Sequence, residues 1–130
     1  MIKKTITYVD FDGNKRTEDY YFNLTKTELT KLQNSELGGL TKLLEKIVKE
    51  DNNVKIVEFF DKFLELAYGV KSLDGKQFVK NKEVWEAFYY SAAYDVLFQE
   101  LFANEKAAAD FVKAVVPPMD EAALAEVTNQ

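Results

Sequence analysis

The chain begins with apolar and polar residues that alternate with a period of two. The alternation covers residues 4–9 and returns over residues 16–24, so one face of each run is largely aromatic or aliphatic and the other is mostly polar. This period is typical of half-buried strands, and Asp12-Gly13-Asn14 between the runs tolerates the positive φ of a tight turn. We therefore predict a β-hairpin over residues 4–24. It must lie on an apolar partner, because an isolated two-stranded ribbon is marginal in water.

From Thr25 onward the apolar residues recur every three or four positions, which is the spacing of amphipathic helices. Thr25 and Glu28 match a capping box, so a short first helix starts there. Apolar stripes predict two further helices over residues 40–48 and 54–68. Gly69 is expected to end the second of these as its C′ residue.

The second half of the chain is expected to be helical after one turn. Residues 70–81 contain Leu73-Asp74-Gly75-Lys76 and form either a loop or a second small hairpin. Asn81 and Asn104 are expected to cap helices, and Ser91 either caps or interrupts the segment after it. Pro117-Pro118 ends the last helix. The sequence therefore predicts an α+β fold, mainly helical, with an N-terminal β-hairpin followed by a bundle of about five or six short helices.

The length of 130 residues is that of one domain. We expect this domain to cover residues 1–118. Residues 119–130 are expected to form an acidic, Ala-rich C-terminal tail with few apolar anchors.

Composition excludes more functions than it suggests. The chain has no Cys and no His, which removes disulfides, thiolate and imidazole chemistry, and the commonest metal ligands. Its net charge of −5, with Arg16 as the single arginine, argues against nucleic acid as a partner. No apolar run is long enough to span a membrane, and the N-terminus lacks the apolar core of a signal peptide. We therefore expect a protein that is synthesised in the cytoplasm.

Candidate catalytic and metal sites are weak. Residues 10–14 faintly resemble a calcium loop, but a hairpin turn built on Asp10 is favoured. Glu18 and Asp19 are neighbours on a strand and point to opposite faces, so they cannot form one acid–base pair. We expect no enzymatic activity and no cofactor.

Aromatic residues make up 14% of the chain and are the most informative feature. At helical spacing they are usually core, but adjacent aromatic residues on one helix cannot all face the same way. Some must therefore be exposed, and an exposed aromatic patch indicates a protein partner or self-association. The candidate partner-binding residues are Phe59, Phe63, Tyr68, Tyr89, Tyr90 and Tyr94.

Three stretches, in this order and at this spacing, resemble tail assembly chaperones of long-tailed phages that infect Gram-positive hosts. They are MIKKTITYVDFDGN at residues 1–14, continued by EDYYFNLTKTEL at residues 18–29, then YGVKSLDGKQFVK at residues 68–80, and AAADFV at residues 107–112. The resemblance covers residues 1–118. It is a similarity of overall pattern, because the family has no catalytic signature. No residue-level binding motif can be carried over from it.

The resemblance implies a non-enzymatic role in the host cytoplasm. Such chaperones coat the long, hydrophobic, coiled tape measure protein and keep it soluble until tail tube subunits polymerise around it. A longer form made by programmed ribosomal frameshifting is thought to recruit the major tail tube protein, and the chaperone leaves before the virion matures. The main alternative is a structural virion component, such as a tail or head–tail completion protein. A third possibility is a small acidic inhibitor of a host enzyme.

Overall fold

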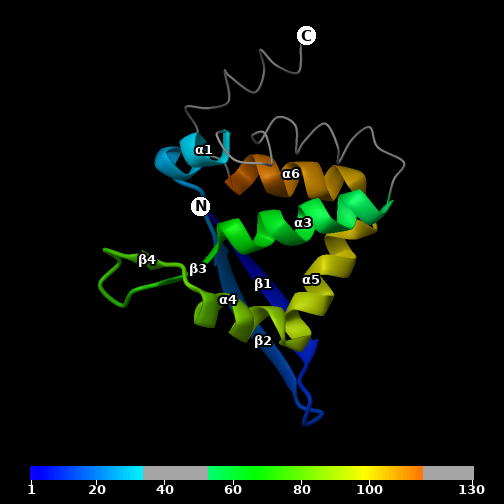
Figure 1. The fold of residues 1–130 in the computed structure, drawn as a ribbon. Helices are drawn as coiled ribbons and strands as arrows, with labels where there is room; N and C mark the ends of the chain where they lie inside the picture. Colours follow the sequence, from blue (N-terminus) through cyan, green and yellow to red (C-terminus); the bar gives the residue numbers. More distant parts are fainter. Residues whose placement is uncertain (34–52, 116–130) are drawn as a thin grey trace.

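The computed structural model of the chain describes residues 1–33 and 53–115 (Figure 1). In chain order these residues form β1 (Ile2–Val9), β2 (Lys15–Phe22), α1 (Lys26–Gln33), α3 (Asn53–Ala67), β3 (Tyr68–Lys71), β4 (Phe78–Val79), α4 (Lys82–Tyr89), α5 (Ala92–Phe102) and α6 (Glu105–Val115). The expected α+β class is confirmed, with more helix than strand. The expected helix over residues 40–48 and the expected tail over residues 119–130 lie outside the described residues.

The N-terminal hairpin is present as the alternation predicts. Strands β1 and β2 pair antiparallel from Ile2 opposite Phe22 to Val9 opposite Lys15. Asp10 organises the turn, because its Oδ1 atom accepts hydrogen bonds from the backbone N–H groups of Asp12 and Asn14, each at 2.9 Å. Gly13 adopts a φ of 85°, which a residue with a side chain rarely does. The expected hairpin turn built on Asp10 is therefore confirmed.

Residues 70–81 contain the second small hairpin rather than a plain loop, and this hairpin extends the sheet. Strand β3 pairs antiparallel with β4, and it also pairs with β2 through Tyr21 opposite Gly69 and Phe22 opposite Tyr68. The strand order is β1-β2-β3-β4. Gly69 does stand at the C′ position after α3, but it lies within β3 and its φ is not positive, so the expected glycine cap of the helix is not formed. Gly69 is needed for packing: a Cβ atom there would lie 2.6 Å from the Phe78 ring.

Gly69→Ala is expected to lower the free energy of unfolding by about 1–3 kcal/mol, because the added methyl overlaps the Phe78 ring and displaces it. The same substitution in a Phe78→Leu background should cost less, since the flat ring is gone. Urea denaturation of the wild type, both single variants and the double variant measures this coupling. An equal cost in both backgrounds would contradict the packing described.

The helices cover one face of the sheet. On β1, Ile6 is buried whereas its neighbours Thr5 and Thr7 are exposed, so only alternate side chains point into the core. In Figure 1, α3 and α6 cross the end of the hairpin near the N-terminus, and α4 and α5 meet in a corner along its length. Phe63 of α3 and Phe111 of α6 pack edge to face with ring centroids 6.4 Å apart. This arrangement encloses the core and leaves the outer sides of α4 and α5 facing solvent.

Side-chain caps fix where α4, α5 and α6 begin, as their sequences predict. Asn81 Oδ1 accepts from the Val84 N–H at 2.8 Å at the start of α4, and Ser91 accepts from the Tyr94 N–H at the start of α5. The expected caps at Asn81 and Ser91 are therefore confirmed. Asn104 accepts from two N–H groups in the first turn of α6.

The capping box of α1 is joined to the partly buried ammonium of Lys80. Glu28 accepts from the Thr25 N–H at 2.9 Å, and Thr25 Oγ1 accepts from the Glu28 N–H at 3.1 Å. Lys80 Nζ donates to Glu28 Oε2 at 2.7 Å and also to the carbonyls of Asn23 at 2.6 Å and Leu66 at 2.8 Å. One side chain thus connects the segment after β4 to α1, to α3 and to the end of β2.

Candidate functional site

The structure divides the six candidate partner-binding residues between the core and the surface. Phe63 is fully buried, and Tyr68 and Tyr94 are each only 9% exposed, so these three residues do not supply the exposed aromatic patch that the sequence predicts. Tyr89 is 36% exposed and Tyr90 is 69% exposed. The side chain of Phe59 lies outside what the structure describes. That Tyr89 and Tyr90 contact a partner stays a prediction.

The physical reason for this division is the position of each residue on its helix. Phe63 lies on the same side of α3 as the buried Phe60 and Ala67, three and four residues away, and that side faces α6. Tyr94 lies in the first turn of α5, with its ring 5.5 Å from that of the buried Phe88. Both residues therefore contribute to stability, and Tyr94 reaches the surface only at its edge.

Aromatic rings form a continuous row across α4 and α5. Trp85 and Tyr89 are four residues apart on α4, and Tyr94, Phe98 and Phe102 follow at the same spacing on α5, so each set lies on one side of its helix. Successive ring centroids are 5.4, 4.9, 5.9 and 5.8 Å apart, which is the range of favourable ring contacts. These five residues are called the aromatic stripe below.

Tyr90 stands at the corner between the two helices. Helix α4 ends at Tyr89 and Ser91 caps α5, so Tyr90 occupies the bend, with its ring 5.2 Å from that of Tyr89. Phe102, at the other end of the aromatic stripe, is 38% exposed. Large aromatic side chains that are half exposed and adjacent to one another are typical of protein-binding surfaces.

Two open hollows lie beside the aromatic stripe, where it faces α3. The first, of about 350 Å³, is lined by Trp85 and Tyr89 and by charged residues of α3. The second, of about 410 Å³, is lined by Val57, Tyr89, Tyr94 and Phe98 together with two carboxylates. Asp61 and Tyr89 line both hollows, so the two form one furrow between α3 and the corner of α4 and α5.

Asp61 is held at the centre of this furrow by Tyr94, whose hydroxyl donates a hydrogen bond to the Asp61 Oδ1 atom. Burial, and after it this hydrogen bond, raises the pKa of Tyr94 well above its usual range. Tyr94 therefore remains a protonated donor at any physiological pH. Its ring supports the aromatic stripe while its hydroxyl positions a carboxylate at the surface.

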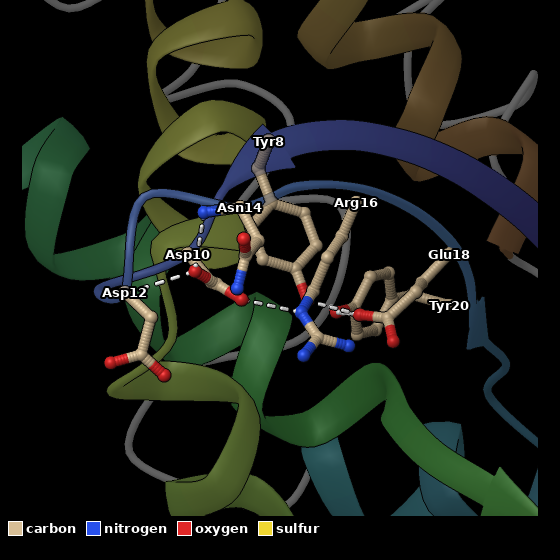
Figure 2. A network of polar contacts seen from close by, with 7 residues as sticks. All are labelled: Tyr8, Asp10, Asp12, Asn14, Arg16, Glu18 and Tyr20. Atoms are coloured by element: carbon tan, nitrogen blue, oxygen red, sulfur yellow. Dashed lines mark hydrogen bonds and ion pairs between the residues drawn. The ribbon is translucent and has the colours of Figure 1, made fainter.

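A second polar cluster lies on the hairpin and has a structural role (Figure 2). Arg16 Nε donates to Asp10 Oδ2 at 2.6 Å, and Glu18 Oε1 accepts from the hydroxyls of Tyr8 and Tyr20. The Arg16 guanidinium, followed by the N–H of Asn14, lowers the pKa of the Asp10 carboxyl. These contacts connect the two strands to each other and to the turn. Within residues 1–33 and 53–115, no group of three potential metal-ligating side chains lies close enough together to hold a metal ion.

The sequence prediction missed three members of the aromatic stripe, namely Trp85, Phe98 and Phe102. Their spacing of four residues from Tyr89 and Tyr94 is a signal that the sequence contains, but it indicates a shared helix side without telling whether that side faces the core. The carboxylates of the furrow were missed as well, because charged residues on a helix are usually solvated and gain meaning only from their neighbours in space.

Comparison with known proteins identifies the family. A family model described as phage tail assembly chaperone matches residues 1–128, whereas no curated protein and no solved structure matches the chain. Among the helices that the structure describes, none has both the length and the apolar character required to cross a membrane. Membership of a chaperone family favours a non-enzymatic role. Because the match spans nearly the whole chain, the protein belongs to the phage tail assembly chaperone family.

Proposed function

We propose that this chaperone binds the tape measure protein in the host cytoplasm and keeps it soluble while the tail tube assembles around it. Membership of the family supports a role in tail assembly. The observation that supports client binding is that Tyr89 and Phe102 of the aromatic stripe, together with Tyr90, have exposed rings, and that Tyr89 lines an open furrow. A long hydrophobic client needs such a surface, because its own apolar residues aggregate when they face water.

The charge of the chain supports the second half of this role. A chaperone that covers apolar segments has to leave the complex more soluble than the free client. The net charge of −5 supplies repulsion between coated complexes. Several weakly bound copies that associate with one another along one client would also gain avidity. A bound copy holds the next copy close to its own segment of the client and so raises its effective concentration there.

The test is recovery of the client by a tagged chain. Replacing Tyr89 and Tyr90 together by Ser is expected to reduce recovery of the tape measure protein from phage-producing cells about tenfold, because exposed aromatic anchors supply much of the energy of such interfaces. Mass spectrometry of the recovered proteins measures the loss and also the size of the tagged chain itself. Thermal unfolding of the double variant checks that the domain still folds.

The control is Leu73→Ser, which removes an apolar side chain that is even more exposed than those of Tyr89 and Tyr90, from the β3–β4 turn. In Figure 1 this turn projects away from α5. Recovery of the client by this variant should equal that of the wild type. Unchanged recovery by the Tyr89→Ser/Tyr90→Ser variant would contradict the proposed surface. A chain that is abundant in purified virions and recovers no tape measure protein would instead favour a structural virion component.

A further inference from the structure

We infer that the furrow beside the aromatic stripe takes a basic amphipathic helix, that is, a client segment with an apolar row flanked by Lys or Arg. The inference rests on the proposed function and names the chemistry of the segment that is bound. It follows from three properties of the furrow: its apolar floor, its uncompensated negative charge, and its position between helices.

The apolar floor is provided by the second hollow. Val57 of α3 and Phe98 of α5 both line it, and the ring of Tyr94 lies next to those of Phe98 and Tyr89. A hollow of about 410 Å³ accommodates large aliphatic or aromatic side chains of a partner. The first hollow continues past Tyr89 to Trp85 and provides a second, neighbouring position. Two adjacent positions suit side chains that recur along one side of a helix.

The charge of the furrow is strongly asymmetric. Four carboxylates line the two hollows, those of Glu58, Asp61 and Glu65 on α3 and of Asp95 on α5. Lys62 is the one basic residue among the described side chains that line them, which leaves a net charge of −3, and its ammonium pairs with Glu65 at 3.3 Å.

Three of these carboxylates have no cationic partner among the side chains that the structure describes. Glu58, Asp61 and Asp95 form no ion pair with any Lys or Arg side chain in the described part of the chain. A partner that brings cations to the rim is attracted at a distance and docks in a fixed register, whereas an acidic partner is repelled.

The same charge disfavours two other occupants, namely residues 119–130 and a second copy of the chain. Residues 119–130 contain Asp120, Glu121 and Glu126 and no basic residue, so as an occupant they would add like charge to the furrow. A second copy carries a net charge of −5. The charge of the furrow therefore favours a basic segment over either of these two occupants.

A helix fits better than an extended segment. The furrow is bounded by helices α3, α4 and α5, whose backbone N–H and C=O groups are used within the helices, so it offers no strand edge to an incoming chain. An extended segment would lose hydration of its backbone there without gaining hydrogen bonds. A helical segment satisfies its own backbone and presents only side chains, which is the usual mode of docking in an apolar groove.

The test uses the full chain and three synthetic helical peptides with an identical apolar row, flanked by Lys and Arg, by Gln, or by Glu. Trp85 is the single tryptophan and lines the furrow, so its fluorescence reports binding at this surface. We expect the basic peptide to bind about tenfold more tightly than the Gln peptide at about 50 mM NaCl, and this preference to shrink at about 300 mM. The Glu peptide should bind most weakly.

Variants of the chain assign the preference to the furrow. Asp61→Asn/Asp95→Asn keeps the side-chain size and should reduce the preference for the basic peptide at least threefold, whereas Asp110→Asn on α6 removes a carboxylate elsewhere and should leave it unchanged. Equal binding of the basic and Glu peptides, or no change in Trp85 fluorescence with any peptide, would overturn the inference.

Two further results separate this inference from the proposed function. Recovery of the tape measure protein with equal binding of all three peptides supports the function and overturns the charge preference. Binding of the basic peptide without recovery of the tape measure protein supports the chemistry of the furrow and removes the proposed client. Self-association in sedimentation experiments that Tyr89→Ser abolishes would make a second copy the occupant and overturn the inference.

Discussion

Phe22→Ala is expected to lower the free energy of unfolding by about 3–5 kcal/mol, the largest loss among the substitutions considered for this protein. Phe22 is fully buried on β2, and its ring contacts three others, those of Phe111 at 5.2 Å, Tyr68 at 5.6 Å and Phe88 at 5.9 Å. Its removal opens a cavity where β3, α4 and α6 meet the hairpin. A domain of ordinary stability, about 5–15 kcal/mol, would lose a large share of it.

Urea denaturation followed by circular dichroism measures the loss, with Phe11→Ala as the control. Phe11 is 84% exposed in the turn between β1 and β2, so its truncation should change the free energy of unfolding by less than about 0.5 kcal/mol. If the two substitutions cost the same, Phe22 is not the centre of the core. The pair also shows how a buried and an exposed phenylalanine on the same hairpin differ in effect.

The distinction between core and surface matters for experiments on client binding. Substitution of Phe63 reduces recovery of a client by unfolding the domain, since this side chain is fully buried. Substitution of Tyr90 acts on the surface alone. Binding data are therefore informative only beside a measurement of stability for the same variant.

Local features of this fold could be predicted from the sequence, because neighbours in the chain determine them. The first hairpin follows from the alternation and from Asp12-Gly13-Asn14, and the caps at Asn81 and Ser91 follow from side chains that bond N–H groups three residues on. The pairing of β3 with β2 could not be predicted in this way. It joins segments that are distant in the chain, and the glycine that permits it also matches the signal for a helix end.

The candidate site shows the same limit. Adjacent aromatic residues at Tyr89 and Tyr90 imply that some ring is exposed, and both are. That Phe63 points into the core depends on how α3 lies against α6, which no local pattern encodes. The acidic rim depends on the same packing, because Asp61 and Asp95 come from different helices and meet only in the folded chain.

Lys80→Met is expected to lower the free energy of unfolding by about 1.5–3 kcal/mol, the second-largest effect. The Lys80 side chain is 21% exposed, and its ammonium donates to the carbonyls of Asn23 and Leu66 and to Glu28. Methionine fills the space but donates nothing, so three acceptors lose their partner at the junction of β2, α1 and α3. The matched control is Lys82→Met: Lys82 is 89% exposed and lies 3.7 Å from Glu86, so its loss should cost less than about 0.5 kcal/mol.

The pH dependence of the stability lost in Lys80→Met identifies the cause of the loss. Burial acts to raise the pKa of Glu28, but the hydrogen bond from Lys80, the Thr25 N–H and the charge of Lys80 outweigh it, so the pKa lies below its usual value of 4.5. A lowered pKa in the folded state contributes stability that is present above pH 4.5 and is lost as the pH falls through the folded value. The gap in stability between the wild type and Lys80→Met should therefore be widest near pH 7 and should narrow as the pH falls below 4.5. Urea denaturation across this range measures it, and a gap independent of pH would assign the loss to the two carbonyls alone.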